Sequence, residues 1–152
     1  MSTQAVTLTK IGFNSDIKLG DVIKLDNREA IIIKIYGMSW SPWRKESIIE
    51  CDAVVQFVDS TDESLGLQEQ AEMVQQYKAN ETTSMFKPND LFDVKEDGNH
   101  CAYYQIKDIV DFKYSFVDLV VTYKAELIQE WPKYKVDRAV QANRRSNFTV
   151  IK

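Results

Sequence analysis

The chain has 152 residues, of which 44% are hydrophobic and 28% are charged, with a net charge of −4. This balance is typical of one soluble globular domain and excludes an intrinsically disordered chain. No apolar run in the sequence approaches the length of about 18 residues that a membrane span needs. The first ten residues lack the basic start and apolar stretch of a secretion signal, which favours an intracellular protein.

Apolar alternation and β-branched residues predict strands along most of the chain. We expect residues 1–16 to be an extended, partly ordered lead-in and residues 37–45 to be a loop. The turn signal Asp26-Asn27-Arg28 predicts a hairpin whose second strand is central, and further turns are predicted at Lys87–Asp90 and Asp97–Asn99. The predicted strands cover residues 21–25, 29–36, 47–59, 82–86, 91–94, 103–108, 109–116 and 117–128.

One segment predicts a surface helix, at about residues 62–78. Ser60-Thr61-Asp62-Glu63 has the form of a capping box, with acidic residues in the first turn. Apolar residues follow at helical spacing, at Leu67, Ala71, Val74 and Tyr77.

The last segment, residues 132–152, is basic. It holds six basic residues and one acid, a charge of +5, so the remaining chain has 13 basic and 22 acidic residues, a charge of −9. The acidic part suits a basic partner such as a histone tail and disfavours non-specific DNA binding. The sequence of the tail predicts a short helix near Val136–Asn143. The tail is either solvated or in contact with phosphate, with an acidic surface or with the body of the chain itself. Its candidates for weak nucleic-acid contact are Lys133, Lys135, Arg138, Arg144 and Arg145.

Together these elements predict a mainly β protein. Many short strands without a βαβ rhythm indicate a small twisted β-barrel-like domain with one inserted surface helix and a short C-terminal extension. The expected boundaries are a lead-in at 1–16, the β domain at 17–131 and the basic extension at 132–152.

The residues that catalysis needs do not form a recognisable constellation. The single histidine, His100, is adjacent to Cys101, and neighbouring residues of a strand point to opposite faces, so we expect no Cys–His dyad. Cys51 and Cys101 are expected to be buried free thiols. Nucleotide-binding and zinc motifs are missing and the carboxylates lie in surface-like runs, so we expect no enzyme, no metal and no cofactor.

Aromatic residues are the distinctive feature. Trp40 and Trp43 flank Pro42 in the predicted loop, where they either close one end of the barrel or grip a peptide or cation. A methyl-lysine cage needs several aromatic faces and a nearby acid. Candidate walls are Tyr36, Trp40, Trp43, Phe57, Tyr103 and Tyr104, and candidate acids are Asp59, Asp62 and Glu63.

The order of the motifs resembles the BAH (bromo-adjacent homology) domain of chromatin proteins. The FKPNDLFDV stretch at 86–94 is similar to a family motif in which Asn, an acid, Leu and Phe follow one another. The other matching stretches are LGDVIKL at 19–25, AIIIKIYGMSW at 30–40, VVQFVDSTDE at 54–63 and IKDIV at 106–110.

This resemblance implies a twisted β-barrel-like fold with short helical connections. It also implies binding to nucleosomes, histone tails or other chromatin proteins, in some members through a cage for methylated lysine. Carried over by position, Trp40 and Phe57 are the cage walls and Asp59 or Asp62 the acid. Phe57 stands where the family usually has Trp.

Our leading hypothesis is therefore a nuclear chromatin-binding module that engages a histone tail or nucleosome. Its expected binding residues are Trp40, Trp43, Phe57, Asp59, Asp62 and Tyr103. One alternative is a scaffold or assembly subunit that binds a folded protein through the predicted helix and basic tail. Another is a small barrel that binds single-stranded nucleic acid through stacked aromatics.

Overall fold

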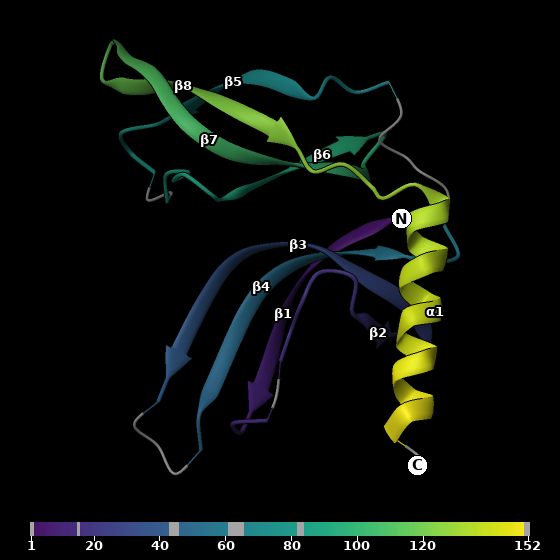
Figure 1. Cartoon of the computed structure of the whole chain (residues 1–152). Coiled ribbons are helices and arrows are strands. Elements are labelled where there is room, and N and C mark those ends of the chain that lie inside the picture. The colour runs from purple at the N-terminus through teal and green to yellow at the C-terminus, as the bar shows by residue number, and fades with distance from the viewer. Residues whose placement is uncertain (1, 15, 43–45, 61–65, 82–83, 151–152) are drawn as a thin grey trace. The chain divides into compact units, whose positions relative to one another are not determined.

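The computed structural model describes residues 2–14, 16–42, 46–60, 66–81 and 84–150, with side chains as far as residue 143. It confirms a mainly β fold with one C-terminal helix in this described part (Figure 1). The elements are β1 (Thr3–Ile11), β2 (Val22–Leu25), β3 (Arg28–Ser41), β4 (Ile48–Phe57), β5 (Gln70–Tyr77), β6 (Leu91–Glu96), β7 (Asn99–Ser115), β8 (Asp118–Leu127) and α1 (Lys133–Val150).

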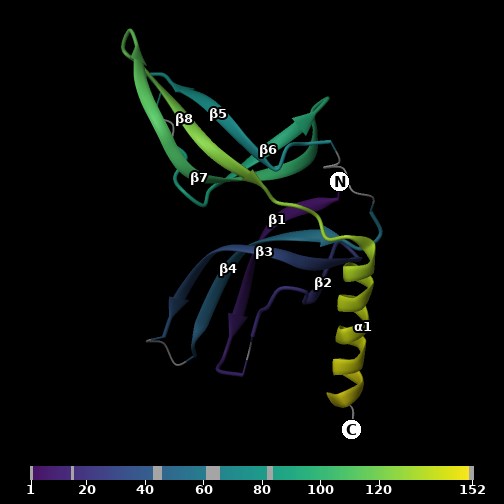
Figure 2. The same cartoon turned by 45° about the horizontal axis from the view of Figure 1, so that its top comes forward.

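The chain divides into two compact units, residues 1–63 with 130–152 and residues 64–129. Each unit contains one antiparallel four-stranded sheet. The strand order is β1-β4-β3-β2 in the first unit and β5-β8-β7-β6 in the second. The strands of each sheet are strongly curled, as expected for twisted β structure (Figure 2).

The first unit is built around β3 and β4. The predicted β2–β3 hairpin is confirmed, with Asp26 and Asn27 both at positive φ (50° and 64°), the geometry of a type I′ turn. β3 is an inner strand, as its unbroken apolar run predicted. The buried core consists of Ala30, Ile32, Ala53, Val55 and Phe57.

The N-terminal lead-in forms a complete strand. β1 pairs with β4 from Thr3 opposite Gln56 to Ile11 opposite Ile48, so it is one of the two edge strands of the first sheet. Its side chains Val6 and Leu8 pack on the core. This segment is therefore ordered by pairing that the sequence pattern did not show.

The basic extension forms α1, which confirms the predicted helix and lengthens it. Pro132 directly precedes α1, and its carbonyl accepts hydrogen bonds from the backbone of Lys135 and Val136. Asn143 holds the helix to the segment before β2. Its side chain donates to the carbonyl of Gly20 (3.2 Å) and accepts from the backbone N–H of Val22 (3.4 Å).

The second unit has its core on one face of β7 and β8. Its buried residues include Tyr104, Ile106, Val121, Tyr123 and Leu127. The two strands predicted at 103–108 and 109–116 are one long strand, β7, which begins after the predicted Asp97–Asn99 turn. β6 confirms the strand predicted at 91–94.

The helix predicted at 62–78 is wrong over the residues that the structure describes, because β5 occupies 70–77. Residues 61–65, with most of the supposed capping box, lie outside the described residues. Ala71 and Tyr77 are six residues apart, an even spacing that places both on the same, half-buried face of β5. Val74, which completed the helical pattern, is 67% exposed and lies on the outer face of β5.

Two smaller predictions are also wrong. The loop expected at 37–45 begins later, because β3 continues to Ser41 and includes Trp40. Of the strand expected at 82–86, the described residues 84–86 are not in a strand. Cys51 and Cys101 are buried and form no disulfide, as expected.

Candidate functional site

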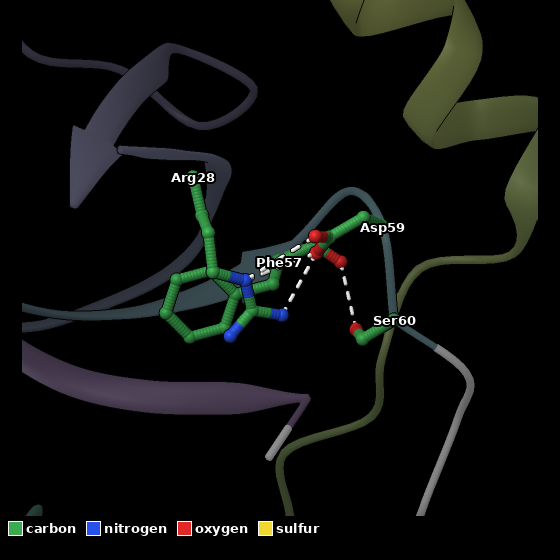
Figure 3. Close-up of polar contacts among 4 residues, drawn as sticks. All are labelled: Arg28, Phe57, Asp59 and Ser60. Atoms are coloured by element: carbon green, nitrogen blue, oxygen red, sulfur yellow. Dashed lines mark hydrogen bonds and ion pairs between the residues drawn. The ribbon is translucent and has the colours of Figure 1, made fainter. Parts of the chain in front are cut away.

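The clearest side-chain cluster joins two predicted site residues, Phe57 and Asp59, to Arg28, which was not predicted (Figure 3). Arg28 opens β3 directly after the type I′ turn, and Phe57 ends β4 opposite Ala30. The guanidinium of Arg28 lies 3.9 Å from the centroid of the Phe57 ring. The same guanidinium donates two hydrogen bonds to Oδ1 of Asp59, at 2.8 and 3.2 Å, and one to Oδ2 at 3.3 Å.

Electrostatics tie this cluster together. The hydrogen bonds from Arg28 lower the pKa of Asp59 below its usual value, and in turn raise the pKa of Arg28. Ser60 stabilises the turn after β4, because its hydroxyl donates to the carbonyl of Phe57 at 2.8 Å. The carboxylate is thus held where it meets the guanidinium.

Phe57 is only 2% exposed, so its ring is part of the core and Arg28 covers it. A cation over an aromatic face beside a carboxylate is the chemistry expected of a methyl-lysine cage. Here the cation comes from within the chain. The structure therefore brings Phe57 and Asp59 together, as predicted, but with their cation-binding capacity already in use.

An open groove of about 520 Å³ lies beside this cluster. It is formed by the β2–β3 turn, the end of β4 and one side of α1. Three carboxylates line it against a single guanidinium, so it is net acidic. The lining residues are Asn27, Arg28, Glu29, Val58, Asp59, Asp137, Val140 and Gln141.

Trp40 lies far from this groove. It pairs with Ile49, ten residues along β3 from Ala30, and a strand rises about 3.3 Å per residue, so roughly 30 Å of strand separates it from Phe57. Its indole N–H donates to the hydroxyl of Ser47 at 2.9 Å, and 61% of the residue is exposed. Trp40 and Phe57 therefore do not form the walls of one cage.

The remaining predicted site residues do not complete a cage in the described part of the chain. Trp43 and Asp62 lie outside the described residues. Tyr103 belongs to the second unit, where its ring centroid lies 4.3 Å from that of His100. His100 in turn contacts the carboxylate of Asp93 through Nδ1. These three side chains form a local cluster on β6 and β7.

The basic residues of the tail are only partly free to meet nucleic acid. The ammonium of Lys135 lies 4.0 Å from the centroid of the Trp131 ring, so this cation has a partner within the chain. Trp131 is fixed by Gln56, whose side chain accepts from its N–H (2.7 Å) and donates to its carbonyl (3.0 Å). The side chains of Arg144 and Arg145 are beyond the described ones.

Sequence reasoning missed two features. The first is Arg28, because its place over Phe57 depends on the pairing of β3 with β4. The second is the exposed apolar end of the β7–β8 hairpin, whose signal was present in the sequence as the run Phe112, Tyr114 and Phe116 between polar residues. From the sequence, that run was interpreted only as part of a strand.

Within the described residues, no group of three or more His, Cys, Asp or Glu side chains is placed to hold a metal ion. Across the same residues, no helix has both the length and the apolar character needed to cross a membrane. No family model matches this chain, and neither a curated protein sequence nor a solved structure gives a significant match. The resemblance to the BAH family therefore rests on the quoted motifs alone.

Proposed function

We propose that this chain is a chromatin-associated binding module, without a catalytic site, that engages a basic segment such as a histone tail. The observation that supports this most is the acidic groove beside Arg28 and Asp59. The charge of −9 outside residues 132–152 supports it further, because it attracts basic segments over longer distances. The expected location is the nucleus.

Recognition in this groove is electrostatic. The carboxylates of Glu29 and Asp137 are exposed and line the groove, so they offer ion pairs to lysine or arginine side chains. Asp59 already pairs with Arg28, so an incoming cation competes for it. Such contacts are individually weak, and we expect an affinity of about micromolar, roughly 8 kcal/mol.

Methylation of the lysine is not expected to strengthen binding. Of the predicted cage walls that the structure describes, Phe57 alone is placed next to the residues of this groove, and Arg28 covers its ring. A methylated ammonium would therefore meet carboxylates without an open aromatic face. We therefore propose that the groove recognises the positive charge of the bound segment and does not distinguish methylated from unmethylated lysine.

Fluorescence anisotropy with histone-tail peptides, unmodified and trimethylated, tests this proposal on the whole purified chain. We expect similar binding of both forms and a loss of five-fold or more in the double variant Glu29→Gln, Asp137→Asn. Glu72→Gln is the matched control, since it removes an exposed acid from the second unit. Equal binding by the double variant and the control, or no binding by the wild type, would contradict the proposal.

A second candidate function is a scaffold or assembly subunit that recognises a folded protein. The observation that favours it is the cluster of exposed apolar side chains on the β7–β8 hairpin. A stable, stoichiometric complex with a non-histone protein, unaffected by the groove variants, would support this function over histone binding.

A further inference from the structure

The β7–β8 hairpin ends in a group of exposed apolar residues, which we call the hairpin tip. Their exposed fractions range from 43% to 100%, with Phe116 at the upper limit. Phe112 and Tyr114 contact each other edge to face, with ring centroids 6.4 Å apart. Single exposed apolar residues are common on protein surfaces, whereas a contiguous group marks an interaction site. The tip residues are Ile109, Val110, Phe112, Tyr114, Phe116 and Val117.

The loop of this hairpin has an unfavourable backbone. Ser115 pairs with Asp118, which leaves a two-residue loop of Phe116 and Val117. Phe116 has φ = 57°, a region that side chains other than Gly, Asn and Asp rarely adopt. A positive φ at the first loop position alone is the pattern of a type II′ turn, where glycine is usual.

The other two-residue hairpin loops of this chain follow the usual rule. Asp26-Asn27 and Asp97-Gly98 are all at positive φ, and all are residue types that tolerate it. Among the two-residue hairpin loops within the described residues, the third alone places an aromatic residue at positive φ. Its side chain is fully exposed, so burial within the chain does not compensate for the strain. Strain of this kind collects at functional sites.

The tip is held in place by its base. β7 and β8 pair up to Ser115 and Asp118, and β5 supports β8 as far as Tyr77 opposite Leu119. The carboxylate of Asp118 accepts from the side chain of Gln76 (3.1 Å) and from the backbone of Ala79 (3.1 Å). A hairpin supported in this way loses little conformational freedom on binding, which favours affinity.

We propose that the hairpin tip docks into an apolar pocket of a protein partner, and that the rim of this pocket is basic. Aromatic side chains that enter a pocket are the commonest anchors of protein interfaces. The charge of the segment determines the rim, because residues 108–118 carry three acids and one base, a charge of −2. This surface lies in the second unit, so the proposal is independent of the acidic groove.

The same charge disfavours two other occupants. Anionic membrane surfaces attract basic segments and repel a segment of charge −2. A second copy of the chain would bring two negatively charged tips together, at a cost that opposes self-association. A protein pocket with a basic rim satisfies both the apolar side chains and the acids.

Site-specific photo-crosslinking, followed by binding measurements, tests the proposal. Val117→p-benzoylphenylalanine in living cells should capture a protein that the same substitution at Phe13 does not. Phe13 is the matched position, because it is 82% exposed and lies in the first unit. The captured protein is then purified and titrated against the whole chain.

We expect Phe116→Gly to weaken binding of that purified protein ten-fold or more, and Phe13→Ser to change it less than two-fold. Phe116→Gly also relieves the strained turn, so its thermal midpoint should not fall, and unfolding will not explain the lost affinity. The proposal is overturned if both crosslinking positions capture the same proteins, or if Phe116→Gly binds like the wild type. It is also overturned if the crosslinks join two copies of the chain, or if the tip binds lipid vesicles with equal dependence on Phe116.

Discussion

Phe116→Gly is expected to stabilise the fold, although it removes a large aromatic side chain. The ring is fully exposed, so its removal sacrifices no buried apolar surface within the chain. What changes is the backbone. At φ = 57° an L-residue other than glycine is strained, and glycine adopts this conformation at no steric cost.

The size of the gain follows from two opposing terms. A left-handed conformation costs an L-residue about 1–2 kcal/mol. Glycine loses more backbone entropy on folding, which costs about 0.5–1 kcal/mol. The difference is a net stabilisation of about 0.5–1 kcal/mol, which in a chain of 152 residues raises the thermal midpoint by about 1–4 °C.

Urea unfolding, monitored by tryptophan fluorescence and by circular dichroism, tests whether this change in stability occurs in the second unit, which contains Phe116. All three tryptophans, Trp40, Trp43 and Trp131, lie outside residues 64–129, so tryptophan fluorescence reports on the first unit. Far-ultraviolet circular dichroism reports on both sheets. We expect Phe116→Gly to shift the dichroism transition to higher urea more than it shifts the fluorescence transition.

Asp97→Gly is the matched control. Asp97 has φ = 53° in the other two-residue loop of the second unit, and Asp tolerates this region, so we expect a change of less than about 0.5 kcal/mol. If Phe116→Gly were neutral or destabilising relative to this control, the Phe116 ring would have to contribute to folding. The reasoning that assigns the ring to a partner would then fail.

Three further substitutions test the rest of the structure by urea unfolding. Asp59→Asn should destabilise at pH 7. Pairing with Arg28 lowers the folded-state pKa of Asp59 below 3.8, so the ion pair stabilises the fold above pH 3.8, and this stabilisation is lost as the pH falls through the folded-state pKa. The free energies of unfolding of the wild type and the variant should therefore become equal in acid. A difference in free energy that stays constant with pH would contradict the ion pair. Tyr123→Phe should cost about 0.5–1.5 kcal/mol, since it removes the 2.7 Å hydrogen bond to Tyr77, and a neutral result would show that this bond contributes nothing. Ile106→Ala should cost about 2–5 kcal/mol because the side chain is fully buried, and a cost below 1 kcal/mol would place it outside the core.

The parts of the fold that local chemistry determines were predictable. Asp26-Asn27 and Asp97-Gly98 favour tight turns, and the hairpin predicted at the first and the turn predicted at the second are both present. The segment at 62–78 was not predictable in the same way. Its apolar residues Leu67, Ala71 and Val74 recur at helical spacing, and only the pairing of this segment with β8 decides in favour of a strand.

The candidate site depended even more on tertiary pairing. Phe57 and Asp59 are two residues apart, so their proximity could be predicted from the sequence. Arg28 is 29 residues before Phe57, and nothing local indicates that the β3–β4 register places its guanidinium over the ring. Trp40 was assigned to the same cage as Phe57 through the resemblance to the BAH family, but strand length separates the two residues.

The two proposed surfaces bind through different forces, so salt separates them. Ion pairs in the groove are exposed, and the Debye length falls from about 8 Å at 0.15 M salt to about 3 Å at 1 M. A ligand of the groove should therefore dissociate at 1 M salt, and its affinity should not change in the Phe116→Gly variant. A partner of the hairpin tip should keep most of its affinity at 1 M salt, because burial of aromatic surface is not screened. The affinity of that partner should not change in the double variant Glu29→Gln, Asp137→Asn. If one ligand responded to both sets of variants with a single salt dependence, the two surfaces would be parts of one interface, and assigning them to separate partners would be wrong.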